Sequence, residues 1–283
     1  MSNFFIETID FKSKFAPEIL VKSLCETGFA VIRNHDVDKE LIDSVYNEWK
    51  LFFNSKNKYN YKFDIEKQDG YFPILSENAV GYKAKDLKEF YHIYLPWGRI
   101  PEEISSDTID LRNQLVDIGS KILIWIDENT PSNISKSFSM PLKDMISNSP
   151  NNLLRVLHYP PLDGKEDKGS LRAAAHGDIN LITILLSGSQ PGLQVLNKNK
   201  KWIDVSSNKG WLIINAGDML NKCSNNYYPS TIHRVVNPSN SANISRYSMP
   251  LFLHPRDEVV LTEKYTALSY LDKRLKSLGL KNK

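Results

Sequence analysis

Three residues of the sequence are able to hold one metal ion together: His176, Asp178 and His233. A single glycine separates His176 from Asp178, and residues i and i+2 of an extended segment point to the same side. His233 lies inside a later run of β-forming residues, STIHRVV. Two imidazoles and one carboxylate form the facial triad of non-haem Fe(II) sites, but the same donors also suit catalytic Zn²⁺. The three residues alone therefore predict a metal site without fixing its chemistry.

A second pair of residues, Arg246 and Ser248, shares one face of another apolar run. The planar guanidinium of arginine pairs with a carboxylate through two parallel hydrogen bonds, and a hydroxyl adds a further donor. An open metal face beside such a carboxylate clamp is what a 2-oxoacid co-substrate requires. The clamp favours an oxygen-activating iron enzyme over a zinc hydrolase, in which it has no evident task.

The composition is that of an ordinary globular protein. Of the 283 residues, 41% are hydrophobic and 24% are charged, and the formal net charge of +3 is too small to predict nucleic acid as the main partner. The two cysteines form neither a thiolate metal motif nor a disulfide framework. No stretch reaches the ~18 apolar residues of a membrane span, and the first residues lack a signal-peptide pattern. We therefore expect a cytoplasmic monomer that acts on a small molecule, without a nucleic-acid or membrane partner.

The first half of the sequence alternates predicted helices with isolated strands. Apolar residues recur at helical spacing in three segments, and Gly28 follows the first of them as a typical helix end. The predicted elements are helices over 17–27, 38–54 and 107–129, strands over 4–10 and 29–34, and an irregular aromatic region over 57–100.

From residue 150 the sequence consists mainly of short β-forming runs. Turn signals such as SGSQPG and NPSNSAN separate these runs. Short strands at such regular spacing predict a sandwich or barrel of the jelly-roll kind. The predicted strands cover 153–159, 171–176, 181–187, 192–196, 201–205, 211–215, 230–236 and 244–253, and a helix is expected over 262–278.

The predicted fold is α+β, with a double-stranded β-helix (jelly-roll) core, an N-terminal helical layer and a C-terminal helix. No internal repeat or low-complexity linker divides the chain, so a single domain is expected over 1–283. Within it, 1–149 is the N-terminal helical and strand region, 150–258 is the jelly-roll core with the iron site, and 259–283 is the C-terminal helix.

Several motifs, in order along nearly the whole chain, resemble those of one known family. The sequence resembles the isopenicillin N synthase-like family of 2-oxoglutarate/Fe(II)-dependent dioxygenases. The motifs that carry the resemblance are LRVLHYPP (154–161), AAAHGDIN (173–180), GLQV (192–195), INAGDML (214–220), STIHRVVNP (230–238) and RYSMPLFL (246–253), with a weaker N-terminal match in GFAVIRNHDV (28–37).

The resemblance implies a reaction and assigns residues to it. Fe(II) would be held by the two histidines and the aspartate. The distal carboxylate of 2-oxoglutarate would be held by Arg246, Ser248 and Tyr159. O₂ and 2-oxoglutarate would be consumed and succinate and CO₂ released while a small metabolite is oxidised. Hydroxylation is the default outcome, desaturation and ring closure are others, and ascorbate is a candidate reductant.

The sequence departs from the family pattern at two places near these residues. Leu157 stands where the family often has Asn, two positions before Tyr159, so one family contact to the co-substrate is missing. The common His-Thr-Asp becomes His176-Gly177-Asp178, which keeps both ligands. Related halogenases lack the carboxylate, so the retained Asp178 argues against halogenation.

Four residues are candidates for contact with the substrate. Tyr71 and Phe72 lie in the aromatic region where this family places substrate-facing loops, and loops of this sort carry specificity. Arg172 is placed to reach an acidic substrate from the barrel mouth, and Asn215 is expected near the iron pocket. Plain packing and outward-facing strand positions are the competing interpretations.

Three alternatives to a 2-oxoglutarate-dependent dioxygenase remain open on the sequence. Some enzymes of this fold are Fe(II) oxidases that use no 2-oxoacid and place another anion at the Arg-x-Ser pair. A zinc hydrolase and a metal-free binding protein are more remote, because the intact triad and clamp argue against both.

Overall fold

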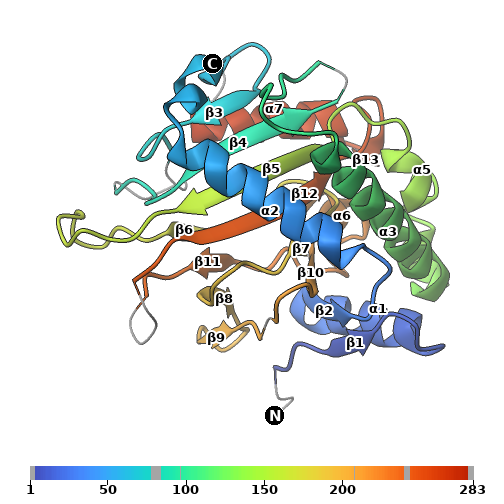
Figure 1. The fold of residues 1–283 in the computed structure, drawn as a ribbon. Coiled ribbons are helices and arrows are strands. Elements are labelled where there is room, and N and C mark those ends of the chain that lie inside the picture. The colour runs from blue at the N-terminus through green and yellow to red at the C-terminus, as the bar shows by residue number, and fades with distance from the viewer. Residues whose placement is uncertain (1–3, 78–83, 96, 207, 239–242, 280–283) are drawn as a thin grey trace.

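An eight-stranded mixed sheet forms the centre of this computed structural model, which describes residues 4–279 except 78–83, 96, 207 and 239–242. Its strands run in the order β1-β2-β10-β7-β12-β5-β4-β3 (Figure 1). Neighbouring strands are antiparallel except β1 and β2, which are parallel. The strands span Thr8–Asp10 (β1), Phe29–Arg33 (β2), Gly70–Phe72 (β3), Glu89–Tyr94 (β4), Leu153–Tyr159 (β5), Ile182–Leu186 (β7), Leu212–Ala216 (β10) and Arg246–Leu253 (β12).

A smaller antiparallel sheet packs against one face of the large sheet. Its order is β6-β11-β8-β9, with β6 at Ala173–His176, β8 at Leu193–Leu196, β9 at Trp202–Asp204 and β11 at His233–Val235. A short hairpin, β13 (Val260–Thr262) with β14 (Tyr265–Thr266), stands apart from both sheets. The two sheets share one buried apolar cluster, which includes Phe29, Phe90, Leu157 and Ile213 of the large sheet and Val195 and Val235 of the small one.

Three long helices pack against the opposite face of the large sheet (Figure 1). Helix α1 ends at Gly28, whose φ of 75° is a left-handed conformation that glycine adopts at little cost. Helix α2 begins after Asp38, whose carboxylate accepts a hydrogen bond from the backbone N–H of Glu40. The helices span Ala16–Thr27 (α1), Lys39–Asn54 (α2), Asp107–Asn129 (α3), Ser132–Ser135 (α4), Leu142–Ile146 (α5), Asp218–Cys223 (α6) and Ala267–Leu278 (α7), with a 3₁₀ helix at Lys56–Tyr61 (η1).

Alternation along the strands separates two sets of side chains. In β10, Ile214 belongs to the core under the helices, whereas its neighbour Asn215 lies on the side of the small sheet. In β12, Met249 belongs to the same helix-side core, and Arg246 and Ser248 alternate with the core positions. The polar residues of the central strands therefore lie in the space between the two sheets.

The structure confirms the three long predicted helices within one residue at each end. The prediction of an irregular region over 57–100 is wrong. That region contains β3 and β4, which pair with each other and extend the large sheet beyond β5. Such short strands are stabilised by their pairing partners more than by their own sequence pattern. Among the described helices, none has both the length and the apolar character needed to cross a membrane.

The N-terminal region is more than the predicted helical layer, because β1 to β4 belong to the large sheet. Several strands are also shorter than predicted, since a strand extends only as far as its ladder of hydrogen bonds. Predicted strand 4–10 is formed only at Thr8–Asp10, 171–176 at Ala173–His176 and 230–236 at His233–Val235, and the C-terminal helix begins at Ala267 rather than at 262.

A buried carboxylate, Glu89 of β4, ties the edge of the large sheet together. It accepts hydrogen bonds from Lys58 Nζ at 2.8 Å, from His158 Nδ1 at 2.7 Å and from the hydroxyl of Tyr71. Burial alone would raise the pKa of Glu89, but these three donors outweigh burial and lower it. Glu89 is therefore held as an ion inside the protein. Tyr71, a predicted substrate residue, has a structural role here.

Replacing Tyr71 with Phe tests this network. The change removes one donor from a buried carboxylate, so we expect the free energy of unfolding to fall by about 1–3 kcal/mol in urea denaturation. Tyr94→Phe, on β4, is the matched control because the Tyr94 hydroxyl has no hydrogen-bond partner among the described residues. If the two variants were equally stable, Lys58 and His158 alone would be enough to stabilise the ionised carboxylate of Glu89.

Candidate metal centre and active site

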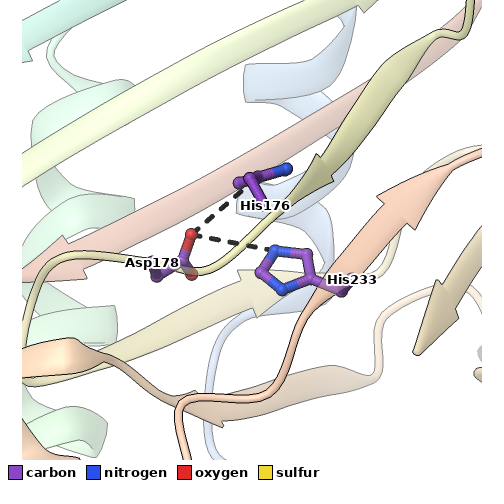
Figure 2. Close-up of side chains that lie close together, drawn as sticks. All are labelled: His176, Asp178 and His233. Carbon is purple, nitrogen blue, oxygen red and sulfur yellow. Dashed lines mark ion pairs between the residues drawn. The ribbon is translucent and has the colours of Figure 1, made fainter. Parts of the chain in front are cut away.

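The pairing of β6 with β11 brings the two predicted histidine ligands together. His233 stands directly opposite His176 in the antiparallel pair, and the ring centroids are 4.5 Å apart. Asp178 lies in the turn after β6. Its Oδ1 is 3.9 Å from Nε2 of His176 and 3.7 Å from Nε2 of His233 (Figure 2). One ligand atom from each residue lies within 4.8 Å of the others, so all three are able to contact one cation.

Backbone carbonyls orient both imidazoles. Nδ1 of His176 lies 2.7 Å from the carbonyl oxygen of Ala174, and Nδ1 of His233 lies 3.2 Å from that of Thr231. A carbonyl can only accept a hydrogen bond, so Nδ1 carries the proton in each ring. Each Nε2 therefore has a free lone pair and faces Asp178. Histidines that bind metals usually donate their other ring N–H in this way, which fixes the tautomer and the ring orientation.

Two donors fix the orientation of Asp178. Thr183 Oγ1 at 2.6 Å and Asn215 Nδ2 at 2.8 Å both donate to Oδ2 of the carboxylate. The two donors are cross-strand partners in β7 and β10, so the large sheet sets their spacing. Because both bonds go to Oδ2, the other oxygen, Oδ1, is the one that faces the histidines.

Burial and nearby charges keep His176 and Asp178 in the protonation states that metal binding requires. Burial, followed by the nearby charge of His233, lowers the pKa of His176 to about 4, so this imidazole is neutral at pH 7. Burial alone would raise the pKa of Asp178. The two histidines, Asn215 and Thr183 outweigh that effect and lower it. A neutral imidazole and an ionised carboxylate are the ligand forms that bind a divalent cation.

The predicted carboxylate clamp lies on the same side of the large sheet. Arg246 and Tyr159 are direct cross-strand partners, and the guanidinium carbon lies 5.2 Å from the centroid of the phenol ring. Ser248 is the partner of Leu157. Arg246 is 3% exposed. Its Nε donates to the carbonyl oxygen of Gln190 at 2.9 Å, and its buried Nη1 has no hydrogen-bond partner in the described part of the chain. A buried cation with a free donor fits an anion at this place.

A cavity of about 490 Å³ opens beside the metal ligands, and His176 and Asp178 form part of its wall. Lys88, also in the wall, pairs with Glu77 at 2.9 Å and Asp86 at 2.8 Å. These ion pairs neutralise the buried ammonium inside the protein. The cavity therefore offers polar groups to a small molecule without a large excess of charge.

None of the four predicted substrate residues belongs to this cavity wall. Phe72 stacks on Phe90 with ring centroids 4.3 Å apart, and Tyr71 bonds to Glu89. Asn215 lies near the metal ligands as expected, but it contacts Asp178. Arg172 is not part of the cavity wall, and its Nη2 donates to the carbonyl oxygen of Ile244, two residues before Arg246. The aromatic cluster is packing because β3 and β4 are paired strands and not loops.

Sequence reasoning missed several polar residues of the site. Thr183 is the one hydroxyl residue within the apolar stretch LITILL, which is a usable signal for a polar position facing the ligands. His254 follows the last residue of β12, is 8% exposed and lines the cavity. Lys88 and Arg155 also line the cavity. No spacing rule links them to the triad, because the sheet brings them there.

Comparisons with known proteins agree with this geometry. Residues 150–255 match the family model of the 2OG-Fe(II) oxygenase superfamily, and residues 6–115 match the model of the N-terminal region of non-haem dioxygenases in morphine synthesis. A protein of Shewanella oneidensis assigned as an oxygenase has a crystal structure that covers 97% of this chain and 98% of its own, with 49% identity and a TM-score of 0.87. The chain belongs to the 2OG-Fe(II) oxygenase superfamily.

Two proteins are similar to this 2OG-Fe(II) oxygenase at lower identity. The structure of a Neurospora crassa protein in complex with alpha-KG and thymine is 24% identical over 96% of each chain, with a TM-score of 0.79, and shows the shared fold. A 1-aminocyclopropane-1-carboxylate oxidase of Dictyostelium mucoroides is 28% identical over 292 residues, 86% of this chain and 77% of its own.

Membership places the protein among the non-haem iron, 2-oxoglutarate-dependent oxidoreductases. The His-Asp-His cluster of the structure suits that iron, because two nitrogens and one carboxylate oxygen leave coordination positions open. The zinc hydrolase and the metal-free binding protein are thereby set aside.

The orientation of Asp178 yields a prediction. Asn215→Ala removes one of the two donors to Oδ2, and loss of such a supporting partner weakens metal binding roughly 10- to 100-fold. We expect this loss in an anaerobic titration of the protein with Fe(II). Asn54→Ala, at the exposed end of α2, is the control and should bind Fe(II) like the unmodified protein.

Thr183→Val provides an independent check of the same contact, since it removes the second donor to Oδ2 while preserving the shape of the side chain. Dissociation constants unchanged in both variants would contradict a role for these residues in orienting the carboxylate.

Proposed function

We propose that this 2OG-Fe(II) oxygenase oxidises a small organic molecule held in the cavity beside His176 and Asp178. His176, Asp178 and His233 bind Fe(II), and Arg246, Ser248 and Tyr159 bind the distal carboxylate of 2-oxoglutarate. The supporting observation is the buried guanidinium of Arg246, which has an unpartnered Nη1 and forms no ion pair with a described Asp or Glu. The two-sheet core would then be the double-stranded β-helix.

Each group contributes through position and charge. Bound iron would supply oxygen activation, and the chain would hold it from two paired strands, β6 and β11, and from the turn after β6, which leaves coordination positions open. Thr183 and Asn215 hold Asp178 so that one oxygen points to the metal. Arg246 fixes the far end of the co-substrate with a charge that cannot be lost near neutral pH. This anchoring places the 2-oxoacid end toward the open face.

The cavity supports a small polar substrate. Lys88 carries three N–H donors, of which two serve Glu77 and Asp86, so the third is left for a substrate acceptor. Burial lowers the pKa of His254 to about 4, so this part of the cavity wall is a neutral imidazole at pH 7. A small substrate is also consistent with the Neurospora crassa protein, whose structure holds thymine. Hydroxylation is the expected outcome.

An Fe(II) oxidase that needs no 2-oxoacid is the second candidate, supported by the similarity to the 1-aminocyclopropane-1-carboxylate oxidase. In that case Arg246 and Ser248 would hold a different anion. The dioxygenase would convert 2-oxoglutarate to succinate as it takes up oxygen, whereas the oxidase would take up oxygen without 2-oxoglutarate.

The first test measures succinate and oxygen with Fe(II)-loaded protein. We expect succinate to form only when 2-oxoglutarate is added, slowly without substrate and faster with it. Asp178→Ala should abolish both metal binding and succinate formation, because it removes one of three ligands. Oxygen uptake that proceeds without 2-oxoglutarate would favour the oxidase, and near-normal turnover by Asp178→Ala would refute the ligand assignment.

Arg246→Ala tests the clamp. Losing one partner of a buried, hydrogen-bonded charge pair costs about 2–5 kcal/mol, so the 2-oxoglutarate concentration for half-maximal succinate formation should rise steeply. Arg33→Ala, at the exposed end of β2, is the control. An unchanged 2-oxoglutarate requirement in Arg246→Ala would show that the co-substrate is anchored elsewhere.

A further inference from the structure

Arg172 and Arg246 are two buried arginines in one region of the fold, because Arg172 Nη2 donates to the carbonyl oxygen of Ile244, two residues before Arg246. Arg172 is 2% exposed and Arg246 is 3% exposed. The guanidinium of Arg246 lies over the Tyr159 ring, and the charge of Arg172 is close enough to interact with both Arg246 and Tyr159. Arg172 immediately precedes β6, the strand that carries His176. Two cations are thus buried together at one end of the space between the sheets.

This pair has no compensating acid in the described part of the chain. Neither arginine forms an ion pair with a described Asp or Glu. Burial, followed by the positive charge of Arg246, lowers the pKa of Arg172. Arginine nevertheless keeps its proton in proteins, so the two charges repel each other inside the fold. Buried charge without a partner is costly, which indicates that an anion completes the pair.

Each arginine also has a buried nitrogen that lacks a hydrogen-bond partner among the described residues: Nε of Arg172 and Nη1 of Arg246. Both side chains also donate to neutral oxygens: Arg172 Nη2 to the carbonyl oxygen of Ile244 at 2.8 Å, and Arg246 Nε to that of Gln190 at 2.9 Å. These contacts hold the two side chains in place but leave both charges uncompensated.

We propose that Arg172 is a second guanidinium anchor for the distal carboxylate of 2-oxoglutarate, acting together with Arg246. The proposal rests on the proposed function. A carboxylate accepts about four hydrogen bonds through its two oxygens, so one carboxylate is able to serve both free donors and the hydroxyl of Ser248. The site would then distinguish strongly between 2-oxoacids that end in a carboxylate and those that do not.

A purely structural role for Arg172 is the competing explanation, because its contact with Ile244 ties down the segment before β12. That contact provides a hydrogen-bond acceptor for Nη2 of Arg172 but leaves its buried Nε without one among the described residues. Arg112 of α3 is an instructive comparison, since it is also buried and also has an unpartnered Nε. For Arg112, burial lowers the pKa, whereas for Arg172 the charge of Arg246 adds to the effect of burial. Arg112 is therefore a matched control for deletion of a buried guanidinium.

The experiment measures binding rather than turnover. Fe(II)-loaded protein is titrated anaerobically by calorimetry with 2-oxoglutarate and with 2-oxopentanoate, which keeps the 2-oxoacid end but replaces the distal carboxylate with a methyl group. Arg172→Gln is compared with the unmodified protein and with Arg112→Gln. Loss of a charge-assisted hydrogen bond predicts a dissociation constant for 2-oxoglutarate raised roughly 10- to 100-fold in Arg172→Gln.

The same variant should bind 2-oxopentanoate unchanged, and Arg112→Gln should bind both ligands normally. Arg172→Lys keeps the positive charge and is the variant to use if Arg172→Gln does not fold. Its affinity for 2-oxoglutarate should lie between those of the unmodified protein and Arg172→Gln. Equal weakening for both ligands would assign Arg172 a structural role and overturn the proposal, as would no weakening at all. An unmodified protein that does not prefer 2-oxoglutarate over 2-oxopentanoate would instead overturn the proposed clamp itself.

Discussion

The antiparallel pairing of β6 with β11 is the constraint on which the site depends. It sets His233 opposite His176, and the turn that leaves β6 places Asp178 within 4 Å of both imidazole Nε2 atoms. The small sheet alone would leave the carboxylate free to rotate. The donors that stop it come from β7 and β10 of the large sheet. The metal centre is therefore formed at the interface between two sheets, and it needs both of them.

The large sheet keeps its two faces chemically distinct. One face carries the apolar side chains that pack under α1, α2 and α3, and this packing supplies most of the hydrophobic stabilisation. The other face carries Asn215, Arg246 and Ser248 toward the small sheet. Because side chains alternate along a strand, a stable core and a polar site can occupy the same strands. A shift of register by one residue would exchange the two faces and destroy both.

Buried charges in this protein are treated in two different ways. Lys88 and Glu89 are compensated within the fold, the first by Glu77 and Asp86 and the second by Lys58 and His158. Arg172 and Arg246 have no acidic partner in the described residues. Arg112 also lacks an acidic partner among the described residues, so a missing acid alone does not indicate a ligand. What distinguishes Arg172 and Arg246 is that two such arginines occur in one region of the fold, where a bound anion would compensate both charges.

The sequence by itself determined the metal ligands, the clamp candidates and the long helices. These features are encoded locally, in the spacing of His176 and Asp178, in the alternation of Arg246 and Ser248, and in the helical period of apolar residues. Tertiary structure decided the rest. β4 exists because β5 offers it a partner, and β3 pairs in turn with β4. Tyr71 bonds to a carboxylate on a neighbouring strand, and Arg172 reaches the carbonyl oxygen of Ile244, just before β12, only in the folded chain. Contacts between distant segments leave no periodic pattern, so a residue's type was readable from the sequence while its partner was not.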